Sequence, residues 1–388
     1  MDRNNVLILI NHYIPGFKFG GPIRSIQAIL LKIGGFYNFR VFTTDRDFGE
    51  DKPYPNLDFN TWVKRDGGHV YYFQGNKLNM LSKLIKEFGK VDTVYLNSFF
   101  SPLFSIGVLF IHTLWRFRSS VIVAPRGEFN SGALSIKSLK KRIYIRLALF
   151  LGLYRKVIWH ATTEDEYKAI KSIFGEDSNV FLAEGMSPQF VHDNIETTIK
   201  ERGKLRLVFI ARIARIKNLL FLLEVLKGIE AQGKIELDIY GPKEDEEYWN
   251  RSNQMIQKVN NVNQDVSISY KGELQYEKVL SVLSNYHFFV LPTLGENFGQ
   301  SISDSFSVGI PVIISQNTPW RDLQDRGIGW DLPLEISFFQ SIINLCCQMP
   351  PDKYLIMKKN CSEFAEKILN NQELINKYKT LFSYGNSQ

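Results

Sequence analysis

The sequence predicts two doubly wound α/β domains, each with a mostly parallel sheet covered by helices. Short runs of β-branched and aromatic residues alternate with longer helical patterns along the chain, which is typical of parallel sheets. A polar stretch without strong periodicity, residues 187–204, interrupts this alternation once. A chain of 388 residues is also longer than one hydrophobic core usually accommodates, which favours two or three domains.

In the first half, each predicted strand is a short apolar run bounded by polar or turn residues. A helix is expected at Pro22–Ile33, because Pro22 follows Gly21 and suits a first helical turn. Thr163 and Glu166 have the spacing of a capping box and predict another helix start. The predicted strands are Val6–Ile10, Phe39–Thr43, Thr93–Asn97, Val121–Ala124, Lys156–His160 and Asn179–Leu182.

After the polar stretch the alternation begins again, which indicates a second domain. Its predicted strands are Leu205–Ile210, Glu236–Tyr240, Ser267–Lys271, Phe288–Leu291 and Pro311–Ile314. A last helix, Cys361 to Phe382, has apolar residues at helical spacing. We therefore expect a first domain at 1–186, a linker at 187–204, a second domain at 205–360 and a C-terminal helix at 361–388 that packs back on the first domain.

Composition excludes several classes of protein. The 47 Lys and Arg against 40 Asp and Glu give a charge of +7, too mild for a nucleic-acid binder without a recognisable module. The apolar run Val6–Ile10 is too short for a signal peptide, and Pro102–Leu114 falls short of the roughly 20 residues that span a bilayer. The three cysteines lack metal-site spacing. We expect a cytoplasmic protein that binds no nucleic acid and handles anions.

Three loops that follow strands carry groups suited to an anionic ligand. Gly20 and Gly21 precede a helix start, where free backbone N–H groups attract anions. Arg212 and Lys217, with Arg215 between them, follow the first strand of the second domain and can grip phosphate. Taken alone, each of these two loops is also compatible with an ordinary turn.

The third loop, Leu291–Gln300, is the most informative. Glu296 lies in a glycine-bracketed turn that opens into a helix expected at Ser301–Val308. The helix start suits a diphosphate, whereas a carboxylate beside phosphate needs a separate task, such as accepting hydrogen bonds from sugar hydroxyls. Asp304 follows eight residues later, in the second helical turn.

Together these motifs make the chain resemble the retaining glycosyltransferases of family four, which have the GT-B fold of two Rossmann-like domains across a cleft. The resemblance implies that Arg212 and Lys217 bind the donor diphosphate and that Glu296 contacts the donor sugar. We further expect the backbone around Asn297, Phe298 and Gly299 to support the phosphates and sugar. The resemblance also implies that Asp304 holds the ribose and that Gly20 and Gly21 lie near the donor phosphates. The segments at 124–128 and 160–163 resemble a subgroup that often builds bacterial surface polysaccharide.

Two positions depart from the family pattern. Asp304 is one methylene shorter than the usual Glu. Arg126 stands where many relatives carry a His near the reacting carbon; it cannot act as a base, so we expect it to stabilise acceptor or phosphate charge. A structural salt bridge in a turn is the alternative for Arg126. The resemblance implies no metal and no cofactor beyond the nucleotide-sugar donor.

A basic stretch from Lys137 to Lys156 also carries many apolar residues. It is either a helix that lies on an anionic membrane, near a lipid-linked acceptor, or the exposed face of a core helix. The sequence thus predicts a retaining glycosyltransferase that acts on a surface glycan such as lipopolysaccharide, in the cytoplasm or at the inner membrane. The alternatives are a non-catalytic sugar-nucleotide-binding partner and a GT-B nucleotide-sugar epimerase.

Overall fold

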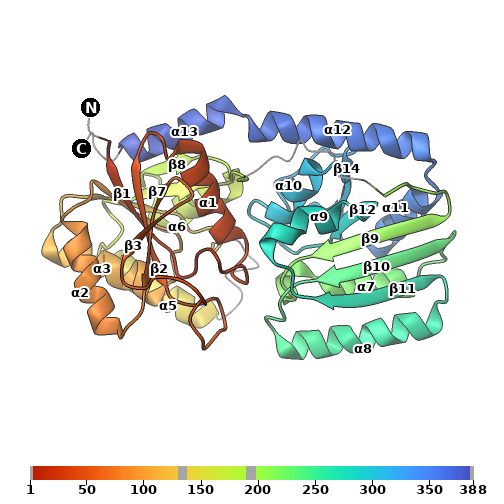
Figure 1. Cartoon of the computed structure of the whole chain (residues 1–388), viewed down its shortest axis with the longest axis horizontal. Helices are drawn as coiled ribbons and strands as arrows, with labels where there is room; N and C mark the ends of the chain where they lie inside the picture. The colour runs from red at the N-terminus through yellow and green to blue at the C-terminus, as the bar shows by residue number, and fades with distance from the viewer. Residues whose placement is uncertain (1–2, 130–137, 189–197, 385–388) are drawn as a thin grey trace. The chain divides into compact units, whose positions relative to one another are not determined.

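The computed structural model describes residues 3–129, 138–188 and 198–384. The chain forms two compact units, one from the residues up to 188 together with those from 371 onward, and one from residues 189–370. Each unit is built on a sheet of its own, with helices on both faces (Figure 1). The predicted doubly wound α/β class is therefore confirmed for both.

The first unit has an eight-stranded sheet of order β3-β4-β2-β1-β5-β6-β7-β8, in which only β3 and β4 are antiparallel. Its strands are β1 (Asn5–Leu9), β2 (Asn38–Thr44), β3 (Trp62–Arg65), β4 (Gly68–Phe73), β5 (Thr93–Leu96), β6 (Ser120–Val123), β7 (Ile158–Ala161) and β8 (Val180–Leu182). Its described helices are α1 (Gly21–Ile33), α2 (Lys77–Phe88), a π-helical turn at Pro102–Gly107, α3 (Val108–Trp115), α5 (Ser138–Phe150), α6 (Glu164–Phe174) and α13 (Gln372–Tyr384).

The second unit has a fully parallel sheet of order β11-β10-β9-β12-β13-β14. Its strands are β9 (Lys204–Ile210), β10 (Lys234–Tyr240), β11 (Val266–Gly272), β12 (Phe288–Leu291), β13 (Val312–Ser315) and β14 (Gly329–Leu332). Its helices are α7 (Leu219–Lys227), α8 (Glu246–Val262), α9 (Val279–Leu283), α10 (Gln300–Ser307), α11 (Ile336–Gln348) and α12 (Pro351–Leu369), with 3₁₀ turns at Arg215–Lys217 and Tyr276–Lys278.

The first strand shows how the sequence builds these layers. Successive side chains of a strand point to opposite faces, so Val6 and Ile8 join one core cluster while Leu7 and Leu9 join the other. All four side chains are fully or almost fully buried. A strand that is buried on both faces needs a continuous apolar run, which is why the run was visible in the sequence.

The C-terminal segment differs from the single helix expected at Cys361–Phe382. It forms two helices, and α12 buries Cys361 and Leu369 in the core of the second unit. The carboxamide of Asn371 accepts a hydrogen bond from the Leu374 backbone at 3.1 Å, which starts α13. α13 then packs beside α1 in the first unit (Figure 1). Residues 361–370 thus lie with the second unit.

The expected linker, residues 187–204, falls partly outside the described residues, which omit 189–197. Its end belongs to the second unit, because Lys200 is buried there and its Nζ donates to the Cys347 carbonyl at 3.0 Å. Lys204 already starts β9. Across the described residues, no helix is both long enough and apolar enough to cross a membrane.

Candidate functional site

In the second unit the strand order reverses between β9 and β12. The chain builds β10 and β11 on one side of β9 and then β12, β13 and β14 on the other. Ligands of doubly wound sheets bind where the loops after two such neighbouring strands diverge. Arg212 and Lys217 follow β9, and Glu296 follows β12, so the topology brings both predicted loops to this switch point.

Backbone hydrogen bonds join the two loops. The Leu294 N–H donates to the Ile216 carbonyl at 2.8 Å. The hydroxyl of Thr293, which is fully buried, donates to the same carbonyl at 2.9 Å. The turn that carries Lys217 and the turn that carries Glu296 are therefore held together by the chain itself.

Lys217 and Glu296 meet directly, since the Lys217 Nζ donates to Oε2 of Glu296. Their side chains are only 14% and 15% exposed, so solvent screens the pair less than a surface pair. The pairing places an ammonium group that can bind phosphate next to a carboxylate that can accept hydrogen bonds from hydroxyls. The charge of Lys217 also offsets the cost of holding Glu296 beside an anion.

The other two cations of the loop point to acids that follow β10. Arg212 donates to Glu244, and both side chains are about one-third exposed, at 35% and 33%. Arg215 donates to Asp245 at 2.8 Å and to Glu247 at 3.1 Å. The backbone N–H of Tyr248, followed by Arg215, lowers the pKa of Asp245. A diphosphate that binds Arg212 has to compete with a carboxylate for it.

Helix α10 begins directly behind the Glu296 turn. Gly299 caps it at φ 78°, and a Cβ there would lie 2.8 Å from Cδ1 of Ile302, so the turn requires glycine. The first-turn N–H groups and the helix dipole favour an anion at this end. Asn297 and Phe298 form the turn, and Asp304 lies in the second helical turn, only 3% exposed.

Hydrogen bonds with residues outside the turn before α10 also hold this turn in place. The Trp320 Nε1 donates to the Phe298 carbonyl, and the two rings lie 5.3 Å apart. The Glu296 N–H donates to the Asn317 carbonyl at 3.0 Å. The loop therefore presents Glu296 from a fixed backbone.

In the first unit, the loop between β1 and α1 carries Gly20 and Gly21. Gly20 is the N-cap of α1 at φ 73°, a conformation that glycine adopts without strain, and the helix starts at Gly21. The buried carboxylate of Asp47 accepts hydrogen bonds from the backbone of Phe17 at 2.8 Å and of Lys18 at 3.1 Å. Asp47 thus fixes the start of the glycine loop.

Arg126 has a set of contacts typical of a structural residue. Its Nε donates to Asn97 Oδ1 at 2.8 Å and its Nη2 donates to the Tyr95 hydroxyl at 2.8 Å. Burial opposes its charge, but Tyr95, Tyr378 and the carboxylate of Glu166 together outweigh this and raise the pKa of Arg126. These contacts favour a role in which Arg126 holds its turn in place, and its proposed contact with acceptor or phosphate stays a prediction.

The Tyr95 hydroxyl continues this chain of bonds to His160, whose Nδ1 lies 2.8 Å away. The Nε2 of His160 donates to the Ala183 carbonyl at 2.9 Å, so Nδ1 accepts from Tyr95. Burial, followed by the charge of Arg126, lowers the pKa of His160 to about 3. His160 is therefore a neutral hydrogen-bonding residue of the core.

The capping box at Thr163 is only half formed. The Thr163 hydroxyl accepts from the Glu166 N–H at 3.1 Å, as expected. The Glu166 carboxylate, however, binds the Thr162 N–H at 2.8 Å and the Gly127 N–H at 2.6 Å. Glu166 is fully buried and ties the turn of Arg126 to the start of α6.

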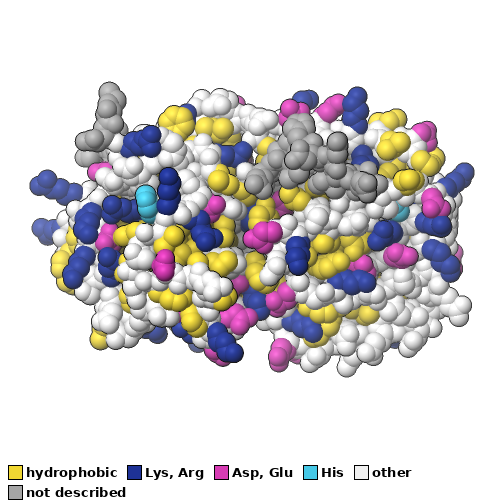
Figure 2. Space-filling model, viewed as in Figure 1, with side chains coloured by type: hydrophobic (Ala, Val, Ile, Leu, Met, Phe, Trp, Pro, Cys, Tyr) yellow, Lys and Arg dark blue, Asp and Glu magenta, His cyan; other side chains and the backbone are white. Residues whose placement is uncertain are grey.

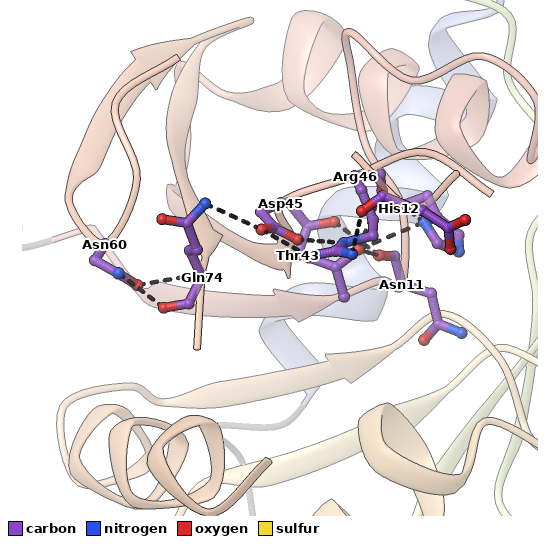
Figure 3. A network of polar contacts seen from close by, with 9 residues as sticks. Asn11, His12, Thr43, Asp45, Arg46, Asn60 and Gln74 are labelled. Atoms are coloured by element: carbon purple, nitrogen blue, oxygen red, sulfur yellow. Dashed lines mark hydrogen bonds and ion pairs between the residues drawn. The ribbon is translucent and has the colours of Figure 1, made fainter. Parts of the chain in front are cut away.

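The sequence did not single out a polar network at the carboxyl ends of β1, β2 and β4 (Figure 3). Its members include Asn11 and His12 after β1, and Asp45 and Arg46 after β2. The signal that could have indicated them is a pair of polar residues directly behind each buried strand. This network lies at the second switch point of the chain, because the strand order of the first sheet reverses between β1 and β5.

Among the residues that the structure describes, no three His, Cys, Asp or Glu side chains are grouped to hold a metal ion. Arg212 and Lys217 supply cations that can offset phosphate charge where the order of the second sheet reverses, between β9 and β12. Independence from metal stays a prediction.

Residues 192–327 match the family model of glycosyl transferases group 1. Similar solved structures include HepE from Anabaena in complex with UDP and glucose, with TM-score 0.69 and 14% identity over 98% of this chain and 100% of that one. Sucrose-phosphate synthase from Thermosynechococcus elongatus gives TM-score 0.71 and 13% identity over 98% and 99% of the two chains. WaaG, a glycosyltransferase involved in lipopolysaccharide biosynthesis, gives 0.64 and 12% over 97% and 99%. No curated protein sequence matches this one.

At such identities the structural likeness shows the fold, which is GT-B, and the family match concerns the unit that carries Arg212, Lys217 and Glu296. The predicted resemblance is thereby confirmed. The chain therefore has the GT-B fold, and residues 192–327 are similar to the glycosyl transferases group 1 family.

Proposed function

We propose that this enzyme transfers a sugar from a nucleoside-diphosphate sugar to a hydroxyl of a lipid-linked surface glycan, with retention of the anomeric configuration. The observation that carries the proposal is the pair of Lys217 and Glu296 at the switch point, directly before the start of α10. A cation, a hydroxyl-binding carboxylate and the N-terminus of a helix together fit a sugar diphosphate.

The proposed roles follow from how charge changes during transfer. As the bond between sugar and phosphate breaks, the leaving diphosphate gains negative charge, which Arg212 and Lys217 neutralise. Glu296 accepts hydrogen bonds from sugar hydroxyls, and the backbone of Asn297, Phe298 and Gly299 supports the phosphates. Asp304 binds the ribose. The acceptor oxygen bonds to the anomeric carbon on the face that the phosphate leaves and passes its proton to that phosphate, so the configuration is retained.

Two structural relatives support the substrate classes. HepE is described in complex with UDP-glucose, and WaaG is involved in lipopolysaccharide biosynthesis. We therefore propose a nucleotide-linked donor, with uridine-linked sugars as the first to test. A surface glycan is the proposed acceptor.

The test measures nucleoside-diphosphate release from uridine- and guanosine-linked sugars, with a crude lipid-acceptor extract as acceptor. Wild type is compared with Glu296→Ala and with the control Glu363→Ala, which removes an exposed carboxylate of the same unit. We expect release from one donor, lost in Glu296→Ala and kept in the control. Donor binding without release in wild type would contradict the transferase and favour the non-catalytic partner. A donor converted to its epimer without acceptor would favour the epimerase.

We also propose that the enzyme attaches to an anionic membrane surface through α5. This helix turns Ala148 into the core but leaves apolar side chains exposed at four-residue intervals. They are Leu139 at 71%, Ile143 at 57%, Leu147 at 52% and Leu151, just behind the helix, at 51%. Lys140, Arg142 and Arg146 are exposed among them, whereas Lys137 lies outside the described residues. Figure 2 shows apolar and basic side chains interspersed on the unit that carries α5.

A basic helix with exposed apolar residues binds anionic lipid by both charge and insertion. Co-sedimentation with anionic liposomes at low salt tests this attachment. Leu147→Glu should release the protein, while Leu355→Glu, at a 61% exposed position of α12, should not. Wild type that stays in the supernatant would contradict the attachment.

A further inference from the structure

The residue behind this inference, His12, lies at the switch point of the first sheet. It follows β1, and the loops after β1 and β5 meet there, because the Ser101 hydroxyl donates to Asn11 Oδ1 at 2.8 Å. His12 is half-buried. The place where ligands of such sheets bind thus contains an imidazole that the proposed function has not used.

The hydrogen bond of His12 fixes which nitrogen can bind a ligand. Its Nδ1 lies 2.9 Å from the Arg46 carbonyl, and a carbonyl oxygen only accepts, so Nδ1 carries the proton. In the neutral ring, Nε2 then holds the lone pair. Within the described part of the chain, Nε2 has no hydrogen-bond partner.

The carbonyl that orients His12 is itself held in place (Figure 3). The Arg46 guanidinium binds both oxygens of Asp45, at 2.8 Å and 3.2 Å, and Asp45 is only 4% exposed. Gln74 donates to the same carboxylate at 3.3 Å, and it exchanges two hydrogen bonds with Asn60 at 2.9 Å and 3.1 Å. Three strand ends therefore cooperate to fix one imidazole, as expected for a preorganised binding group.

Two aromatic rings flank His12. The ring of Phe19, in the glycine loop, lies 5.3 Å from it, and the ring of Phe48 lies 5.8 Å from it. Phe48 is 39% exposed although it is large and apolar. Small-molecule sites commonly combine apolar walls with a few placed polar groups, and a sugar offers both C–H faces and hydroxyls.

We infer that Nε2 of His12 accepts a hydrogen bond from a hydroxyl of the sugar acceptor, while Phe48 packs against a C–H face of that sugar ring. A lone pair repels phosphate oxygens, so this position suits a neutral O–H donor better than the donor diphosphate. His12 is an acceptor-binding residue and takes no proton in the reaction. The inference rests on the proposed transferase function and adds the acceptor contact to it.

The substitution His12→Asn separates binding from structure. An Asn amide can occupy the place of Nδ1 and donate to the Arg46 carbonyl, but it ends before Nε2. The control His69→Asn changes an exposed histidine of β4 in the same unit. Binding of methyl hexosides to the full chain is followed by saturation-transfer NMR, and the acceptor KM is measured in the transfer assay. We expect His12→Asn to weaken hexoside binding about tenfold and to raise the acceptor KM about tenfold, the scale of one lost hydrogen bond. Thermal stability and donor affinity should stay unchanged.

Equal glycoside binding by wild type and His12→Asn, or none by wild type, would overturn the inference. A variant that loses donor affinity or thermal stability in step with activity would overturn it too, since His12 would then be structural. The two proposals fail separately. Glycoside binding that depends on His12, in a chain that releases no nucleoside diphosphate, would support a sugar contact at His12 and contradict the transferase.

Discussion

Lys217 and Glu296, 79 residues apart in sequence, form an ion pair where the order of the second sheet reverses. The family motifs put these residues in two separate loops, and the fold joins them through hydrogen bonds to the Ile216 carbonyl. A carboxylate so close to a phosphate site is tolerable because the ammonium group balances it. The same pairing supplies contacts for both halves of a sugar diphosphate.

Arg212→Ala should lower kcat by roughly 100-fold, the usual scale for losing one donor that stabilises developing charge. The enzyme would keep its fold, because Arg212 is partly exposed and its side chain donates to Glu244, which is also partly exposed. Nucleoside-diphosphate release at saturating donor checks this, with Arg251→Ala as an exposed control on α8. Comparable rates for the two variants would show that the diphosphate binds elsewhere.

Glu244→Gln should strengthen donor binding, whereas Arg212→Ala should impair the enzyme. Its carboxylate competes with the donor for Arg212, and a partly exposed ion pair contributes up to about 1 kcal/mol, so donor affinity should rise by at most about fivefold. Calorimetric titration with the active donor measures the change. Weaker binding would mean that Glu244 itself contacts the nucleotide.

Asp304→Asn tests the ribose contact, because the two side chains have nearly the same shape. Loss of a hydrogen bond to a charged group should weaken donor binding about tenfold or more. The loss should be smaller for 2′-deoxy or 3′-deoxy nucleoside diphosphates, whichever lacks the contacted hydroxyl. An equal loss for both deoxy forms and the parent nucleotide would place Asp304 outside the ribose site.

Addition of EDTA should leave the transfer rate unchanged. In the proposed mechanism, Arg212, Lys217 and the start of α10 offset the diphosphate charge, so no divalent cation is needed. The rate is measured before and after exhaustive chelation, and again with added Mg²⁺. Activity that vanishes with EDTA and returns with Mg²⁺ would contradict this prediction.

The sequence predicted those strands whose apolar runs are continuous, such as β1 and β12, because burial on both faces leaves a strong pattern. It missed β3 and β4, where exposed residues such as Lys64 and His69 interrupt the apolar ones at the antiparallel edge. The Asp66–Gly67 turn between them, with both φ values positive, was the available hairpin signal.

The residues of the candidate site also fall into two groups, those that the sequence predicted and those that it missed. Residues in one contiguous loop, such as Glu296 and Gly299, were predicted from their local pattern. Contacts that join distant segments were not, because no local periodicity encodes them. Arg126 with Tyr95, and His12 with Arg46, belong to this second kind. Both depend on which strands the fold makes neighbours.

Acid should destabilise the first unit through His160. Folding lowers the pKa of this buried histidine from 6.5 to about 3, so the folded form stays neutral while the unfolded chain takes up a proton below pH 6.5. Stability is therefore complete above that pH and falls as the pH drops towards 3, by about 2 kcal/mol at pH 5 from this residue. Urea denaturation at pH 7 and pH 5 measures the difference.

His160→Gln should be less stable at pH 7, because Tyr95 and Ala183 lose a partner, yet its stability should change less between the two pH values. If the variant and wild type lose the same stability on acidification, the unfolded and folded chains bind equal protons at this residue and His160 is not held neutral.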